Sequence, residues 1–123
     1  MRCRMVKPTF DWGNEFDKYL KTLSVKDEAK FRALIDRVEN TELQDSIRKE
    51  RVKKLTDDIY ELRAQTDEHW LRGCYFQIKN TNYYITHGFS KRRNKTPIRE
   101  INKAKKIREI YLNGKGRNED EQE

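Results

Sequence analysis

Two arginines lie inside segments that otherwise have the composition of half-buried β-strands. Arg63 and Arg72 are each surrounded by aromatic and branched residues, where a charged side chain is unusual. Burying an unpaired guanidinium is costly, so each arginine must reach a carboxylate, an open face or an anionic ligand. Glu61 and Glu68 are candidate partners for a structural ion pair. The sequence leaves the ion pair and the bound anion both open.

A run of cations follows the last predicted strand. Residues 89–108 contain nine basic residues and one acid, a net charge of +8. Most charge runs are solvated loops. This one starts where a strand stops, so it would place cations at the end of an open sheet face. The basic residues are Lys91, Arg92, Arg93, Lys95, Arg99, Lys103, Lys105, Lys106 and Arg108.

The charge of the whole chain indicates an anionic partner. Its 123 residues carry a net charge of +7, and 40% of them are ionised. Nucleic acid fits such a chain best, since lysine and arginine displace counterions from a phosphate backbone. No apolar run approaches the roughly 20 residues that span a bilayer, and Met1–Met5 lacks the apolar core of a signal peptide. We expect a cytoplasmic protein without membrane contact, in which Cys3 and Cys74 are reduced thiols.

Two amphipathic helices are predicted in the first third of the chain. The first follows from apolar residues at helical spacing, with Trp12 one turn before Phe16, Tyr19, Leu20 and Leu23. Ser24 with Asp27 matches a helix start signal, and Phe31, Leu34, Ile35 and Val38 then share one face. Residues 41–54 are polar, so we expect a loop or a short helix there.

The centre of the chain predicts three strands joined by short turns, Ile59–Ala64, Trp70–Ile78 and Tyr83–Phe89, which form an antiparallel meander. An additional strand at residues 6–10 is compatible with the sequence. Side chains alternate between the two faces of a strand. Glu61 and Arg63 therefore oppose Leu62, and Arg72 lies on the face opposite Tyr75.

A final helix is predicted to start at Thr96-Pro97, as an N-cap and first-turn proline, and to stop at Asn113-Gly114. The predicted architecture is an α+β domain over residues 1–112, with an N-terminal helical pair packed on an antiparallel sheet and a C-terminal helix. Residues 118–123 hold four acids and no apolar residue, so we expect residues 113–123 to be a disordered acidic tail.

Four motifs then carry a resemblance to a known family. They are Asp58–Arg63 (DIYELR), Leu71-Arg72 leading to Tyr75-Phe76, His87–Arg92 (HGFSKR), and Lys95–Ile101 (KTPIREI) with Ala104. In this order and spacing they resemble the phage-derived, HigB-like (Gp49-like) branch of the RelE/ParE toxin superfamily. The resemblance covers roughly residues 52–112, and the N-terminal third matches poorly.

The resemblance implies a RelE-like, microbial-ribonuclease-like fold with a curved antiparallel sheet. It also implies a toxin of a type II toxin-antitoxin system that cleaves mRNA on the bacterial ribosome and thereby arrests growth. The expected partners are the ribosome, mRNA and a cognate antitoxin, a HigA-like helix-turn-helix protein in a heteromeric complex. No metal or cofactor is needed for cleavage of RNA by its own 2′-hydroxyl.

Cations would then carry the catalysis. Arg72 and Arg63 could hold the scissile phosphate and stabilise its pentacovalent state, and Lys91 or Arg92 could stabilise charge on the attacking or leaving oxygen. Glu61 is either a proton carrier or an ion-pair partner, His87 a packing or hydrogen-bonding residue, and His69 a solvated turn residue. The residues expected to bind RNA are Arg93, Lys95, Tyr75, Tyr84, Lys103, Lys105 and Lys106.

Two alternatives stay open at this point. The same superfamily includes toxins that poison DNA gyrase, and fold resemblance alone does not exclude that activity. A non-catalytic RNA-binding or ribosome-associated module would share the charge and the aromatic residues. Replacing Arg72 by alanine separates a nuclease from a binding module, because turnover should fall far more than affinity.

Overall fold

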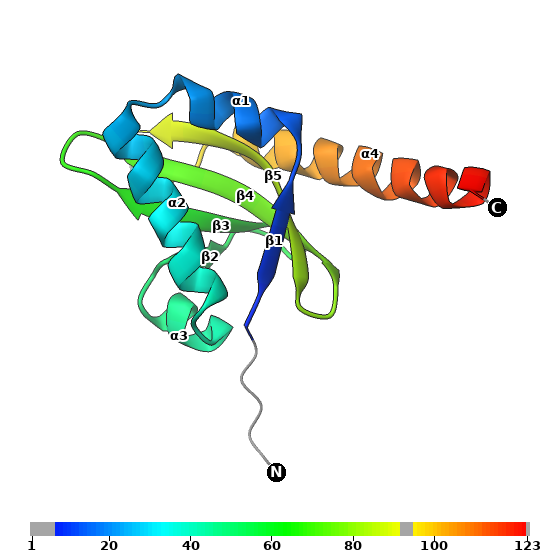
Figure 1. Ribbon diagram of the computed structural model, residues 1–123, viewed down its shortest axis with the longest axis horizontal. Helices are drawn as coiled ribbons and strands as arrows, with labels where there is room; N and C mark the ends of the chain where they lie inside the picture. Colours follow the sequence, from blue (N-terminus) through cyan, green and yellow to red (C-terminus); the bar gives the residue numbers. More distant parts are fainter. Residues whose placement is uncertain (1–6, 92–94, 123) are drawn as a thin grey trace, which may run out of the picture.

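The computed structural model describes the backbone of residues 7–91 and 95–122. Five strands form one sheet in the order β1-β5-β4-β3-β2 (Figure 1). Their bounds are Thr9–Trp12 for β1, Val52–Lys54 for β2, Tyr60–Gln65 for β3, Trp70–Lys79 for β4 and Asn82–Lys91 for β5. All neighbours pair antiparallel except β1, which runs parallel to β5.

Helices α1 (Asn14–Thr22) and α2 (Val25–Glu39) cover one face of this sheet (Figure 1). They form because their apolar residues recur at helical spacing, and α2 begins where the Ser24 hydroxyl accepts a hydrogen bond from the Asp27 amide. Phe16, Leu20, Phe31, Ile35 and Val38 pack there against Leu62, Leu71, Tyr75 and Ile85. This is the larger of two buried clusters, and both helices of the pair follow the prediction.

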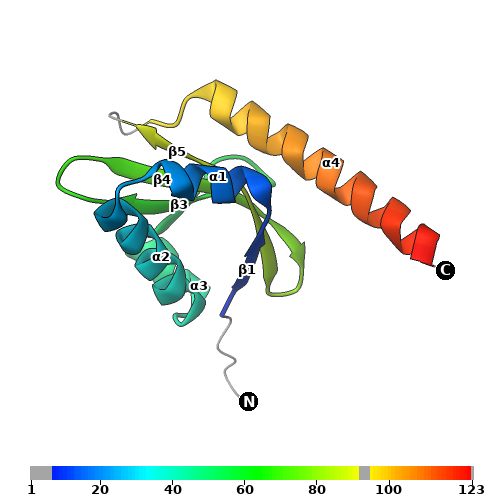
Figure 2. The same ribbon diagram turned by 45° about the horizontal axis from the view of Figure 1, so that its top comes forward.

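Helix α4 (Ile98–Gln122) lies on the opposite face, and its C-terminal half projects past the sheet (Figure 2). Ala104 of this helix is completely buried against a smaller cluster that includes Ile59, Cys74, Phe76 and Phe89. The helix covers β4 and β5. The part of this face formed by β2 and β3 therefore stays open to a ligand.

The contact between Tyr19 and Gly88 explains why the HGF motif requires a glycine at this position. The ring of Tyr19, from α1, rests directly on this residue, and a Cβ atom there would lie 2.1 Å from the Tyr19 Cδ2 atom. The Tyr19 hydroxyl then hydrogen-bonds the Ser90 hydroxyl at 2.9 Å. A side chain at position 88 would lift α1 from β5.

Several predictions of the elements need correction. The sheet is mixed, because β1 forms at Thr9–Trp12 and pairs in parallel with β5, so Trp12 belongs to a strand. The segment predicted as a loop or short helix contains α3 (Leu43–Arg48) and also β2, a strand of three residues. The helix end predicted at Asn113-Gly114 is wrong, since α4 continues to Gln122 and Gly114 lacks the positive φ of a helix-terminating glycine.

Candidate functional site

A buried carboxylate lies at the centre of the candidate site. Glu61, in β3, has an exposed fraction of 1%. It points to the face of the sheet away from α1 and α2, because its neighbours Tyr60 and Leu62 pack toward those helices. An ionised carboxylate at such a depth requires cationic partners.

Three cations surround Glu61. The Nε atoms of Arg63 and Arg72 lie 3.6 and 3.7 Å from Glu61 Oε1, and the ammonium of Lys91 lies 4.0 Å from Oε2. The strand register explains this convergence, since Arg63 of β3 pairs with Arg72 of β4, and Lys91 ends β5. Three neighbouring strands thus each supply one cation.

Thr96 completes the group from the segment that leads into α4. Its hydroxyl donates a short hydrogen bond to Glu61 Oε2 and accepts one from the Lys91 ammonium at 3.0 Å. Thr96 is 6% exposed, so this hydroxyl is shielded from water. We call Glu61, Arg63, Arg72, Lys91 and Thr96 the Glu61 cluster.

The arginines of the cluster keep donors that no described residue satisfies. Arg72 donates from Nη1 to the carbonyls of Leu71 and Ala64, at 3.1 and 3.2 Å. The Nε–H groups of Arg63 and Arg72 are buried and have no hydrogen-bond acceptor within the described part of the chain. A buried donor left in this state costs about 1–3 kcal/mol. An oxyanion that entered the cluster would recover that energy.

The cations of the cluster influence one another's protonation. Burial lowers the pKa of Lys91 below its usual value, Glu61 opposes this, and the charges of Arg72 and Arg63 lower the pKa further. Burial also lowers the pKa of Arg72, again against the effect of Glu61. Three cations around one carboxylate leave an excess of positive charge, and Lys91 releases its proton more easily than an ordinary lysine.

The cluster opens on the side of the sheet formed by β2 and β3. A pocket of about 510 Å³ there is lined by Arg63 and Thr96 together with Lys53, Lys54, Lys95, Glu50, Leu55 and Ile101. A smaller pocket, of about 300 Å³, is lined by both Arg63 and Arg72. A phosphate entering from this side meets Arg63 first, whose side chain is 14% exposed, with Arg72 behind it at 4%.

Comparison with known families identifies the group to which this chain belongs. The family model "Phage derived protein Gp49-like (DUF891)" matches residues 18–109, which is most of the chain. The chain belongs to the Gp49-like family. This phage-derived family is related to the HigB and RelE toxins. No curated protein sequence matches the chain.

The motifs of this Gp49-like protein correspond to contacts that hold the site. Glu61 and Arg63 come from the YELR motif, and Thr96 from the KTP motif. The Nε2 atom of His87, in the HGF motif, forms a hydrogen bond of 3.0 Å with the Glu100 carboxylate of α4. The motifs therefore tie β3, β5 and α4 together around the cluster.

The structure brings together four of the predicted site residues, Arg63, Arg72, Lys91 and Lys95. The ion-pair and anion-binding interpretations of Arg63 and Arg72 are both compatible with the structure, because the two arginines pair with Glu61 and also line an open pocket. Arg92 and Arg93 lie outside the described residues. Lys103, Lys105 and Lys106 are exposed on α4, apart from the cluster, and Lys103 pairs with Glu15 at 3.5 Å.

The two tyrosines predicted to stack on RNA bases have packing roles. The prediction for Tyr75 is wrong, because its ring is 1% exposed and packs on Phe10, Tyr60 and Tyr83 beneath the helical pair. Strand alternation already placed Tyr75 opposite Arg72. Tyr84 is half-buried on the other face, 4.3 Å from the ring of Tyr111 in α4.

Neither histidine belongs to the cluster. His87 is buried and hydrogen-bonded to Thr86 and Glu100, as predicted. Burial lowers the pKa of His87, and the hydrogen bond to the Glu100 carboxylate opposes this. His69 is in a turn and half exposed, but its Nδ1 atom also hydrogen-bonds the buried Asp27 carboxylate at 2.7 Å. That partner was not predicted.

Thr96 is the residue of the cluster that sequence reasoning missed. Its position before Pro97 indicated a helix N-cap, which is a local role. The structure instead directs its hydroxyl to Glu61, a residue 35 positions earlier in the chain.

None of the helices in the described residues has the length and apolar character needed to span a membrane.

Proposed function

We propose that this protein is the toxin of a type II toxin-antitoxin system and cleaves mRNA on the ribosome. The relation of its family to HigB and RelE toxins supports the toxin role. The observation that carries the proposal is the Glu61 cluster, in which two buried guanidinium Nε–H groups have no acceptor among the described residues and lie beside an open, basic pocket. A phosphodiester supplies the acceptors that this arrangement lacks.

Each group of the cluster has a role in the proposed reaction. Arg63 and Arg72 hold the scissile phosphate and stabilise the extra negative charge of its pentacovalent state. The neutral form of Lys91 takes the proton of the 2′-hydroxyl, whose oxygen then bonds to phosphorus as the bond to the 5′-oxygen breaks. The departing 5′-oxygen keeps the bonding electron pair and takes a proton from water. Glu61 and Thr96 position these cations and do not touch the substrate.

The composition of the cluster supports dependence on the ribosome. It holds a carboxylate, two guanidinium groups, an ammonium and a hydroxyl, but no imidazole with a pKa suited to proton transfer at neutral pH. Its own means of moving protons are therefore weak. The ribosome would supply the alignment of the 2′-hydroxyl with the phosphorus. Such alignment removes a large part of the activation barrier.

The partners of the protein follow from the same proposal. The exposed lysines Lys103, Lys105 and Lys106 of α4 would contact phosphates of ribosomal RNA. A cognate antitoxin with a helix-turn-helix domain would hold the toxin inactive in the cytoplasm. Replacing the three lysines by glutamine should weaken ribosome binding most at low salt and make the affinity less dependent on salt concentration, and an unchanged affinity would exclude this docking surface.

Primer extension on a defined mRNA tests the activity. The purified protein is incubated with the mRNA with and without programmed ribosomes, and Arg63→Gln is the main variant because this side chain lies at the open side of the cluster. Arg48→Gln, an exposed arginine on α3, is the matched control. We expect cuts within the decoding-site codon, only with ribosomes, in the wild type and the control but not in Arg63→Gln.

Intact mRNA under both conditions would refute the nuclease. Two further measurements then separate the alternatives: double-strand breaks in plasmid DNA incubated with gyrase would indicate a gyrase poison, whereas ribosome binding without any cleavage would indicate a binding module. Cuts without ribosomes would refute the dependence on the ribosome while retaining the nuclease.

A further inference from the structure

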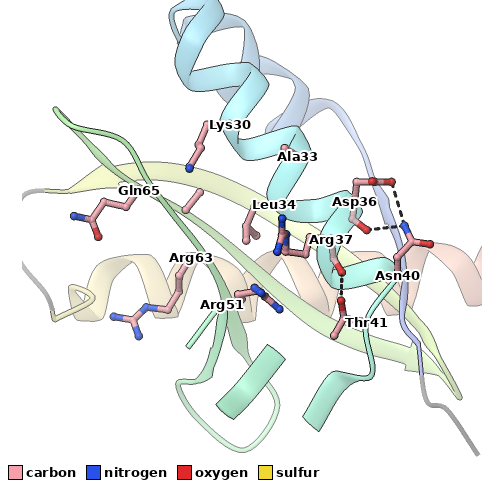
Figure 3. Close-up of a pocket in the computed structure, with 11 residues that line it drawn as sticks. Lys30, Ala33, Leu34, Asp36, Arg37, Asn40, Thr41, Arg51, Arg63 and Gln65 are labelled. Atoms are coloured by element: carbon pink, nitrogen blue, oxygen red, sulfur yellow. Dashed lines mark hydrogen bonds between the residues drawn. The ribbon is translucent and has the colours of Figure 1, made fainter. Parts of the chain in front are cut away.

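A large hollow lies beside the Glu61 cluster, between α2 and β3 (Figure 3). Its volume is about 760 Å³. Residues of α2 line one side and Arg51, Arg63 and Gln65 line the other, with the ends of the Arg63 and Gln65 side chains directed away from α2 (Figure 3). We call this hollow the α2 groove. Arg63 also lines both pockets of the Glu61 cluster, so the groove and the candidate site meet at this residue.

The α2 groove is strongly basic, with four cations, Lys30, Arg37, Arg51 and Arg63, and a single acid, Asp36. The Asp36 carboxylate accepts a hydrogen bond from the Asn40 side chain at 3.3 Å and forms no ion pair with any of the four within the described structure.

Three of the four groove cations differ from other cations nearby, whereas Arg63 is paired with Glu61 and Glu50 at 3.6 and 3.7 Å. On α2, Arg32 pairs with Glu28 at 2.9 Å, and on α3 Arg48 pairs with Asp45. Lys30, Arg37 and Arg51 form no ion pair with any residue that the structure describes. They are therefore available to an anionic ligand, while their neighbours are already engaged within the protein.

The arginines also form a row across the sheet. The amide of Arg63 donates to the carbonyl of Arg51 at 2.8 Å, next to the first register pair of β2 and β3. Arg63 in turn pairs with Arg72 of β4. Neighbouring strands are about 4.8 Å apart, and like charges at directly opposed positions are destabilising. This row favours a ligand that carries several negative charges in succession.

We propose that the α2 groove binds the phosphodiester backbone of single-stranded RNA next to the nucleotide held in the Glu61 cluster. The proposal deepens the proposed function and rests on it, because the groove and the pockets of the Glu61 cluster meet at Arg63. The apolar lining consists of Ala33, Leu34 and Ala64, without an aromatic ring. A groove that anchors a peptide usually offers pockets for larger apolar side chains, so an acidic peptide fits less well than a phosphate chain.

Fluorescence anisotropy with a short labelled oligodeoxynucleotide tests the groove directly. This probe has the phosphates but no 2′-hydroxyl, so cleavage does not disturb the measurement. The groove variant is Lys30→Gln/Arg37→Gln/Arg51→Gln. The control variant Lys18→Gln/Lys21→Gln/Lys79→Gln removes the same charge from exposed positions on α1 and β4. Affinity is measured over a series of salt concentrations.

We expect the groove variant to reduce the slope of log affinity against log salt by about 2, since each phosphate contact on a single strand contributes roughly 0.7. The control variant should keep the wild-type slope. The double variant Lys30→Gln/Arg37→Gln changes only exposed positions of α2 and should reduce the slope by about 1.4 on the same rule. It keeps the test valid if the triple variant unfolds, which circular dichroism would show.

Three outcomes would overturn the proposal. They are equal slopes for the groove and control variants, no binding of the probe by the wild type at low salt, and groove-dependent binding of a polyglutamate peptide while the probe is unaffected. The last would assign the groove to an acidic protein. A wild type that cuts mRNA on ribosomes without groove-dependent binding refutes the groove alone, and groove-dependent binding without any cutting refutes the nuclease alone.

Discussion

The two faces of the sheet are built from the same strands but have opposite character. Beneath α1 and α2, the core cluster is apolar, with Phe16, Phe31 and Leu62 all completely buried. On the other face Glu61, Arg72 and His87 are buried as well, although each is polar or ionisable. Strand alternation produces the difference, since Glu61 and Leu62 are adjacent residues with opposite directions.

This difference separates stability from chemistry. Burying apolar area stabilises the fold by roughly 25 cal/mol for each Å², whereas a buried ion pair often contributes little or costs free energy. The face beneath α1 and α2 therefore stabilises the fold. This stability allows the opposite face to contain buried charged groups. Substitutions on the first face should change the free energy of unfolding, and substitutions on the second should change turnover.

The largest effect is expected from Phe31→Ala on the helix-covered face. The Phe31 ring packs edge-to-face on Phe16 at 5.4 Å and would lie 3.1 Å from a Cβ atom at Gly73, so no neighbour can fill the space left by the ring. Truncation of such a residue costs about 3–5 kcal/mol. Urea denaturation of wild type and variant measures this, and a loss below about 1 kcal/mol would contradict the assigned importance of this face.

Arg72→Ala on the opposite face should reduce single-turnover cleavage of ribosome-bound mRNA by about 10²–10³-fold, the usual loss of one donor to a developing oxyanion. Arg72→Lys keeps the charge but loses the planar pair of donors, so it should recover little of the activity. Both variants are compared at equal folded fraction. A loss of ribosome affinity with an unchanged cleavage step would instead assign Arg72 to binding.

The contrast between the two faces was largely predictable from the sequence. Period-two alternation correctly placed Glu61 and Arg63 opposite Leu62, and Arg72 opposite Tyr75. The helical pair followed from apolar spacing and the Ser24 cap. These features depend on residues close together in the chain, so the spacing of apolar and polar residues in the sequence predicts them directly.

Features that depend on distant partners were not predictable in the same way. The three residues of β2 are too few for a pattern, and β1, which overlaps the additional strand considered at residues 6–10, is defined by its parallel pairing with β5, much later in the chain. The sequence around Thr96 indicates a helix cap, which is a local role. The hydrogen bond from its hydroxyl to Glu61 is evident only in the folded chain. The continuation of α4 through Gly114 likewise overrides a local stop signal.

Thr96→Val tests a residue that acts through the cations of the cluster. Valine matches threonine in shape but leaves Glu61 and Lys91 without the bridging hydroxyl, and removing one partner of a buried hydrogen bond costs about 1–3 kcal/mol. We expect a fall in the cleavage rate of about 10-fold with little change in ribosome affinity. Thr96→Ser restores the hydroxyl and should restore the rate. Equal rates for the valine and serine variants would contradict the positioning role.

The smallest effect is expected at His87, which joins the polar face to α4 through Glu100. Burial lowers the pKa of His87 below 6.5 in the folded protein, with Lys103 adding to this and Glu100 opposing it. As pH falls below 6.5, the unfolded chain binds a proton at this site before the folded chain does, so the free energy of unfolding decreases. The contribution of His87 is present above pH 6.5 and is lost as pH falls through the folded pKa.

Urea denaturation from pH 8 to pH 5 measures this contribution. The His87→Gln variant should lose less stability over that range than the wild type, because it has no imidazole to protonate on unfolding. His69→Gln, at a half-exposed histidine paired with Asp27, is the matched control. If both variants follow the wild-type pH curve in parallel, His87 is not the group that links acid to unfolding, and the polar face is less sensitive to pH than its buried imidazole indicates.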